Sequence, residues 1–147
     1  MLTDSSWFFP ALTLTRVASS SSIAATYVGQ ETLNGQSVLH VSVSQIPPVA
    51  TAPDVSIMQH LTEMDFYLDP TTYLPVALSF NTHPDQTELT DISVQILFSN
   101  YQTFSGVQVP THVQQFLNGC LSLDIQMQSA TLNSGLTISN FPVQVSQ

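Results

Sequence analysis

Residues 92–99 read Ile-Ser-Val-Gln-Ile-Leu-Phe-Ser, and this stretch decides the fold. Apolar side chains recur there at every second position: Ile92, Val94, Ile96 and Phe98. A β-strand presents alternate residues to one face, whereas a helix needs apolar positions three and four residues apart. The stretch therefore predicts a long strand with one buried face.

Two Asn-Gly dipeptides predict tight hairpins on either side of this strand. Asn34-Gly35 separates residues 26–33 from 36–45, and Asn118-Gly119 separates 107–117 from 120–132. This dipeptide readily supplies the two positive-φ residues that a two-residue hairpin loop requires. The four flanking segments are therefore expected to be antiparallel strands.

The last hairpin is expected to carry a second apolar row. Counting outward from Asn118-Gly119 with a regular register places Gln114 opposite Leu123 and His112 opposite Ile125. The row expected on one face consists of Phe116, Leu121, Leu123, Ile125 and Met127. His112 would then point with this row at the rim of the core, either bonded to a carbonyl or contacting a ligand head group.

The remaining segments complete a mainly β domain. Residues 63–68 and 73–80 predict a hairpin around Asp69-Pro70-Thr71-Thr72, which suits a type I turn. Ser5 to Val17 predicts a short helix, and the prolines between Ile46 and Pro53 predict a loop.

We therefore expect one domain over residues 1–147. Residues 1–22 form a helix and a loop, and residues 24–147 form an antiparallel meander of about seven strands. Such a meander is expected to be a strongly curved sheet or an incomplete barrel.

The charge balance excludes several functions. The chain contains ten acidic residues and one basic residue, Arg16, so its formal net charge is -9. Such a chain repels phosphates, which argues against nucleic acid binding and against polybasic attachment to membranes. No run of about 18 apolar residues occurs, so no membrane-spanning helix is expected. Any natural export signal is expected to lie upstream of Met1.

The reactive side chains are scattered along the chain. The four histidines occur singly, and the nearest His–Asp couple, His83 and Asp85, is interpreted as part of a loop turn. The sequence therefore predicts no metal site and no cofactor. Cys120, the single cysteine, is expected to be a small buried apolar residue. No Gly-x-Ser-x-Gly motif occurs and no catalytic constellation is apparent, so we expect no enzymatic activity.

Several motifs resemble a known group of proteins. They are Trp7-Phe8-Phe9-Pro10, residues 27–32, residues 65–69, Tyr101 with Gly106 and Pro110, residues 109–112 and residues 115–119. They are similar to uncharacterised exported bacterial proteins of the lipoprotein-carrier (LolA/LolB-like) fold group. The resemblance covers most of the chain and corresponds to the later part of a full carrier domain. It implies an incomplete curved barrel outside the cytoplasm, with helices across its open side and a cavity for acyl chains.

Two functions follow as hypotheses. The first is a non-catalytic, extracytoplasmic (periplasmic or secreted) domain that binds a lipid or acyl chain on the concave face of its sheet. The residues expected to line that face are Ile92, Val94, Ile96, Phe98, His112, Phe116, Leu121, Leu123 and Ile125. The alternative is a structural or protein-interaction module whose apolar face is buried by its own N-terminal segment or in a homodimer.

Overall fold

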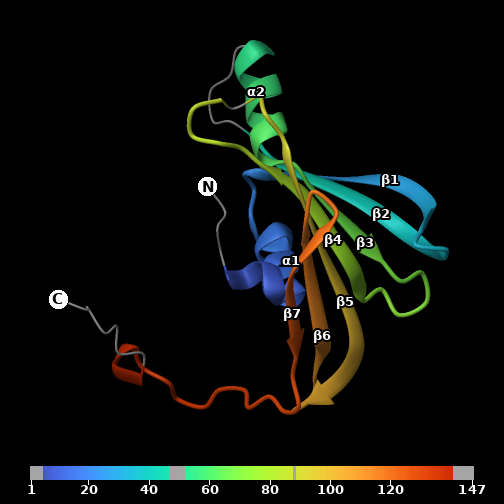
Figure 1. Cartoon of the computed structure of the whole chain (residues 1–147), viewed down its shortest axis with the longest axis vertical. Coiled ribbons are helices and arrows are strands. Elements are labelled where there is room, and N and C mark those ends of the chain that lie inside the picture. Colours follow the sequence, from blue (N-terminus) through green and yellow to red (C-terminus); the bar gives the residue numbers. More distant parts are fainter. Residues whose placement is uncertain (1–4, 47–51, 88, 141–147) are drawn as a thin grey trace.

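The computed structural model describes residues 5–46, 52–87 and 89–140, and its main element is one antiparallel sheet (Figure 1). Seven strands pair in sequence order, with β1 and β7 at the two edges. The strands are β1 (Ile23–Leu33), β2 (Gln36–Gln45), β3 (Met64–Leu68), β4 (Pro75–Thr82), β5 (Ile92–Phe104), β6 (Val107–Leu117) and β7 (Cys120–Gln126). The predicted mainly β meander is confirmed.

Both Asn-Gly hairpins form as the sequence predicts. Asn34 and Gly35 have φ angles of 51° and 80°, and Asn118 and Gly119 have φ angles of 47° and 76°. Asparagine tolerates the left-handed region and glycine adopts it without steric cost. The turn residues therefore fix the loop length between β1 and β2 and between β6 and β7.

The loop from β3 to β4 is held by one carboxylate. The Asp69 Oδ1 atom accepts hydrogen bonds from the backbone N–H groups of Thr71 and Thr72, at 3.0 and 2.8 Å. The Thr72 hydroxyl donates a third bond to the same oxygen at 3.0 Å. These bonds favour the ionised carboxylate, so they lower the pKa of Asp69 below its usual value of 3.8.

We expect Asp69→Ala to lower the melting temperature at pH 7, because the turn loses all three acceptor contacts. We expect Asp69→Asn to keep most of the stability at pH 7, because its amide oxygen still accepts these bonds. The ionised carboxylate contributes stability above the unfolded pKa, and this contribution is lost as the pH falls through the lowered folded pKa. Thermal unfolding between pH 2 and pH 7 should therefore show a weaker acid dependence for Asp69→Asn than for the wild type. An identical acid dependence would contradict this role.

A bulge interrupts the ladder between β3 and β4. Tyr67 pairs with Ala77 and Leu68 pairs with Pro75, which leaves Val76 as the extra residue. The Tyr101 hydroxyl donates a 2.6 Å hydrogen bond to the Pro75 carbonyl oxygen. Burial of this phenol raises its pKa, which keeps the donor protonated. The bulge adds local twist to the sheet.

Four short helical elements accompany the sheet in the part of the chain that the structure describes. They are η1 (Ser5–Phe8), α1 (Pro10–Ser19), α2 (Ala52–Thr62) and η2 (Ile138–Asn140). The predicted N-terminal helix is confirmed, and Pro10 occupies its first turn, where a missing N–H donor costs little. The predicted loop over residues 46–53 is partly wrong, because Ala52 and Pro53 already belong to α2. Residues 47–51 of that loop lie outside the described residues.

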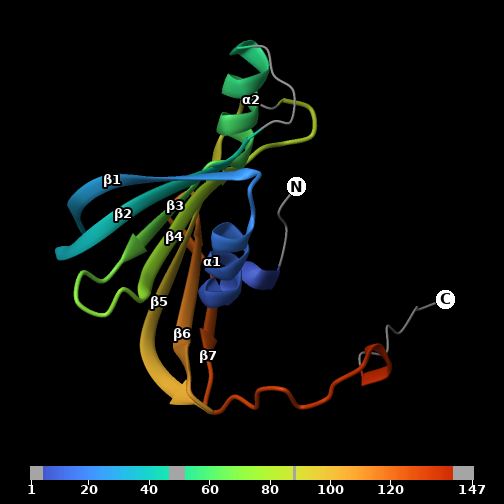
Figure 2. The ribbon, with the colours of Figure 1, turned by 180° about the vertical axis from the view of Figure 1, so that it is seen from behind.

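The core lies on the inner, concave face of the sheet, where α1 sits in the angle between β1–β2 and β5–β7 (Figures 1 and 2). Its buried members are Val43, Met64, Phe66, Leu78, Phe80, Val94, Ile96, Phe98 and Val113. The N-terminal segment contributes Trp7, Phe8, Leu14 and Val17 to this cluster. The Trp7 and Phe80 rings are 4.3 Å apart between centroids. The chain thus fills much of its own concavity.

The predicted register of the last hairpin is wrong beyond its first two pairs. Leu117 pairs with Cys120 and Phe116 with Leu121 as predicted, but Gln115 then pairs with Leu123. Ser122 is the extra residue of a bulge, and its hydroxyl donates a 3.1 Å hydrogen bond to the Gln115 carbonyl oxygen. One inserted residue moves all later side chains to the other face.

Two further predictions for this hairpin are wrong. β7 ends at Gln126, six residues before the predicted end at Leu132, and Met127 already lies beyond it. Cys120 is exposed rather than buried. Among the described strands β7 is an edge strand, which is consistent with the exposure of Cys120.

Candidate functional site

The candidate site is an apolar cavity of about 340 Å³ between α2, η1 and the ends of β2, β3 and β4. Its apolar wall consists of Trp7, Met58, Leu61, Met64 and Phe80. Its polar lining consists of Gln45, Thr62, Glu63, Asn81, Thr82 and His83. An apolar wall with a few polar groups at its margin is typical of small-molecule sites.

Three segments distant in sequence build this wall. Met64 lies on β3 and Phe80 on β4, and the two residues are directly paired, so their side chains share the inner face. α2 places Met58 and Leu61 three residues apart on one helical face. The η1 turn supplies Trp7 from the other end of the chain.

A smaller hollow of about 40 Å³ adjoins this cavity and shares Trp7, Gln45, Thr62 and Met64 with it. Trp7 therefore separates two adjacent spaces. Its indole Nε1 atom is buried, and none of the described residues accepts a hydrogen bond from it. A buried indole N–H ordinarily has an acceptor, so Trp7 Nε1 is an unsatisfied donor among the described residues.

The structure divides the nine residues predicted to bind a ligand between two faces. Val94, Ile96 and Phe98 are buried in the core, as the alternation in 92–99 predicts. Ile92 shares their row, and Leu123 and Ile125 face the same side through their pairs with Gln115 and Val113. The residues placed on the outer face instead are His112, Phe116 and Leu121.

The outer position of His112 corrects its predicted place among Leu123 and Ile125. Its Nε2 atom lies 3.0 Å from Asp124 Oδ1, and its Nδ1 atom lies 3.4 Å from the Ser99 hydroxyl. Gln114 donates a 2.8 Å hydrogen bond to the other oxygen of Asp124. These contacts, that of Gln114 first, lower the pKa of the Asp124 carboxyl. This group is a polar ladder between β6 and β7.

None of the nine predicted residues lines the cavity, although its lining residues Phe80 and Thr82 pair directly with Val94 and Ile92 of the predicted row. The cavity depends on α2, a helix that the sequence patterns above do not predict. Proline at the second helical position followed by Asp54 in the first turn is a helix-start signal that points to it. A ligand-binding role for the predicted inner-face row stays a prediction.

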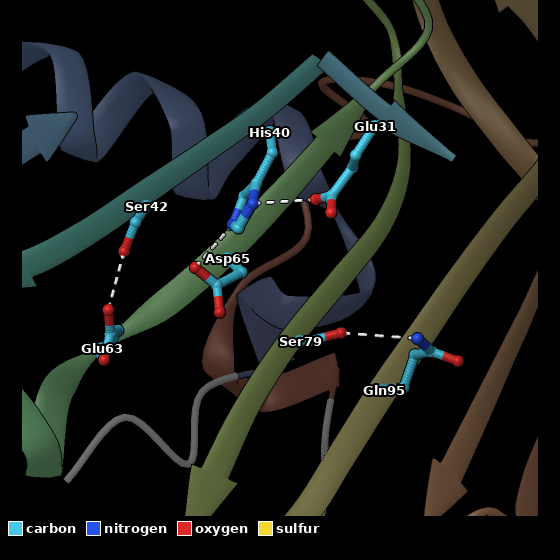
Figure 3. A network of polar contacts seen from close by, with 7 residues as sticks. All are labelled: Glu31, His40, Ser42, Glu63, Asp65, Ser79 and Gln95. Atoms are coloured by element: carbon cyan, nitrogen blue, oxygen red, sulfur yellow. Dashed lines mark hydrogen bonds and ion pairs between the residues drawn. The ribbon is translucent and has the colours of Figure 1, made fainter. Parts of the chain in front are cut away.

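A group of polar contacts on the outer face resembles a catalytic site only superficially (Figure 3). His40 Nδ1 lies 2.8 Å from Glu31 Oε1, and His40 Nε2 lies 2.9 Å from Asp65 Oδ1. Both ring nitrogens therefore face carboxylates, which leaves no nitrogen to accept a proton from a nucleophile. The Ser42 hydroxyl donates to Glu63 at 3.0 Å instead. We interpret these contacts as cross-strand interactions that stabilise the pairing of β1, β2 and β3.

Comparison with solved structures reveals a related fold. A domain assigned as an outer membrane lipoprotein-sorting protein from Vibrio parahaemolyticus matches 82% of this chain, with a TM-score of 0.54 and 17% identity. The two domains share their fold. The resemblance predicted from the sequence is thus confirmed at the level of the fold.

A LolA superfamily protein from Nitrosomonas europaea matches 76% of the chain, with a TM-score of 0.45 and 9% identity. The chain spans about half the length of either protein, namely 46% and 48%. No family model matches the sequence. No curated protein matches it either. Among the described helices, none has the length and apolar character needed to cross a membrane.

Proposed function

We propose that this domain binds an acyl chain or a similar apolar ligand outside the cytoplasm, in the cavity beneath α2. The observation that carries the proposal is the cavity wall formed by Trp7, Met58, Leu61, Met64 and Phe80. The lipoprotein-sorting-like fold supports the ligand class and the extracytoplasmic location. No catalytic step is part of the proposal.

The physical chemistry of the cavity favours such a ligand. Removing apolar ligand surface from water contributes roughly 25 cal/mol for each Å². The volume of about 340 Å³ lies within the range of natural ligand sites, although near its lower end. The polar lining, which includes Gln45, Thr62 and Asn81, offers hydrogen-bonding groups for the head of such a ligand.

The prediction is that a panel of fatty acids and lysolipids contains ligands that raise the melting temperature. At a ligand concentration of about 100 times Kd, linkage adds about 2.7 kcal/mol of stability. In a domain of this size, that corresponds to a shift of about 5 °C or more. Differential scanning fluorimetry would measure the shift, and native mass spectrometry would show a 1:1 adduct.

Two variants of α2 provide a matched test. Met58→Asp places a carboxylate on the cavity wall and should abolish the thermal shift. Ile57→Asp changes the neighbouring residue, which is 53% exposed and does not line the cavity, and should keep the shift. Equal shifts in both variants, or no adduct across the whole panel, would exclude this cavity as the site.

The alternative function, a protein-interaction module, is favoured by a different observation. The N-terminal segment already packs against the core through Trp7, Phe8, Leu14 and Val17, so much of the inner face is filled by the chain itself. Analytical ultracentrifugation at two protein concentrations addresses the homodimer version of this alternative. A monomer that binds none of the tested lipids would favour a protein partner other than a second copy of this chain.

A further inference from the structure

Three side chains from separate elements lie close together where the loop between β4 and β5 begins and ends. His60 lies in the last turn of α2, His83 follows β4, and Asp91 precedes β5. Thr82 pairs with Ile92, so His83 and Asp91 occupy the next positions beyond the end of the ladder. One potential ligand atom from each of the three residues lies within 4.8 Å of the other two.

Two of the three distances within this cluster are close to those between ligands of one metal ion. His60 Nε2 lies 3.3 Å and His83 Nε2 lies 3.1 Å from the same atom, Asp91 Oδ1. Metal–ligand bonds of about 2.0–2.2 Å at tetrahedral angles separate neighbouring ligand atoms by about 3.3–3.6 Å. Two of the three ligand pairs therefore need only small adjustments, and the two imidazole rings lie close together, with centroids 4.8 Å apart.

We propose that His60, His83 and Asp91 form a binding site for a divalent transition-metal ion of the Zn²⁺ class. Two imidazole nitrogens and one carboxylate oxygen suit Zn²⁺, whereas Mg²⁺ and Ca²⁺ prefer oxygen ligands throughout. Three protein ligands leave a fourth position for water or another small ligand. The 45% exposure of the Asp91 side chain provides a path for the ion.

The electrostatic surroundings favour a cation at this place. The formal net charge of the chain is -9, and its single basic residue, Arg16, lies on α1. His60 also lines a shallow depression together with Glu63 and Asp65. A negative field of this kind raises the local concentration of cations.

The other described histidines lack this convergence. The carboxylates next to His40 contact opposite nitrogens of its ring, so His40 and its two partners cannot enclose one ion. His112 shares Asp124 with Gln114, an amide donor, rather than with a second imidazole. Among the described residues, the cluster at the β4–β5 loop is the only group of three with metal-ligand geometry.

A bound ion would connect α2 to the sheet. α2 supplies His60 to the cluster and Met58 and Leu61 to the apolar cavity, while His83 belongs to both sites. The ion would therefore fix one wall of the cavity. The metal proposal does not rest on ligand binding in that cavity, and either can fail without the other.

The test is a Zn²⁺ titration of the tag-free chain after treatment with a chelator. Isothermal titration calorimetry should give one site, and ¹H–¹⁵N spectra of the imidazoles should show shifts for His60 and His83 alone. Mg²⁺ should cause neither effect. Weak binding without saturation at one equivalent, or shifts spread over His40 and His112, would overturn the proposal.

Variants separate the site from adventitious binding. His83→Gln and Asp91→Asn should each weaken Zn²⁺ binding by more than about tenfold, because even outer partners of metal ligands contribute about 10- to 100-fold. His112→Gln removes a histidine from a separate His–Asp pair, with Asp124, and should leave the affinity unchanged, as should Cys120→Ser. Unchanged affinity in His83→Gln would overturn the proposal. If that variant does not fold, the imidazole shifts of the wild type decide the question.

Discussion

Phe66→Ala should lower the free energy of unfolding by about 3–5 kcal/mol, because it removes a large aromatic side chain from the middle of the core. Phe66 lies on β3 near the centre of the inner face and has 0% of its surface exposed. Its neighbours Val41 and Leu78 are its direct cross-strand partners on β2 and β4. The substitution would leave a cavity that a close-packed sheet cannot collapse to fill.

Equilibrium unfolding in urea would measure this loss. Tyr27→Ala is the control, because it removes another strand aromatic whose surface is 61% exposed. Its loss should stay below about 1 kcal/mol, the span of intrinsic β-propensities. Losses of similar size in the two variants would show that the inner face is not the core of the folded chain.

Leu14→Asp should destabilise the domain by about 2–3 kcal/mol, through lost apolar burial and a poorly solvated charge. Leu14 lies on α1 and packs against the core cluster on the inner face of the sheet. The substitution removes this apolar contact and places a carboxylate against the cluster. The result would report directly on whether the N-terminal segment fills the concavity.

Leu12→Asp on the same helix is the matched control for this prediction. Leu12 is 62% exposed, so its replacement changes the charge and the helix propensity without changing the core. We expect a loss within about 0.5 kcal/mol, as for ordinary surface substitutions. Equal losses for the two variants in urea unfolding would show that α1 does not dock on the sheet.

The sequence predicts the strands well because their signals are local. The alternation in 92–99 and the two Asn-Gly turns each depend on neighbouring residues, and all three features are present in the structure. The bulge at Ser122 has no such signal, because serine is equally suited to a regular exposed strand position. Its one-residue insertion moves Leu123 and Ile125 to the inner face, away from His112, Phe116 and Leu121 on the outer face.

The candidate site is harder to predict because tertiary packing assembles it. The cavity joins Trp7 to Met58 and Phe80, far along the chain, and the His60–His83–Asp91 cluster joins three elements. A sequence motif identifies metal ligands only when the ligands lie close together along the chain. The prolines between Ile46 and Pro53 favour a loop and so conceal α2, although proline is acceptable in the first turn of a helix.

The most direct test of the acyl-binding cavity uses Trp7, the only tryptophan in the chain. Because Trp7 lines the cavity, its fluorescence should be quenched by a fatty acid brominated along its chain. The account predicts saturable quenching at one equivalent, displaced by the unbrominated fatty acid and absent in Met58→Asp. Two results would contradict the acyl-binding cavity. One is wild-type fluorescence that saturating brominated ligand leaves unchanged, and the other is equal quenching in the wild type and in Met58→Asp.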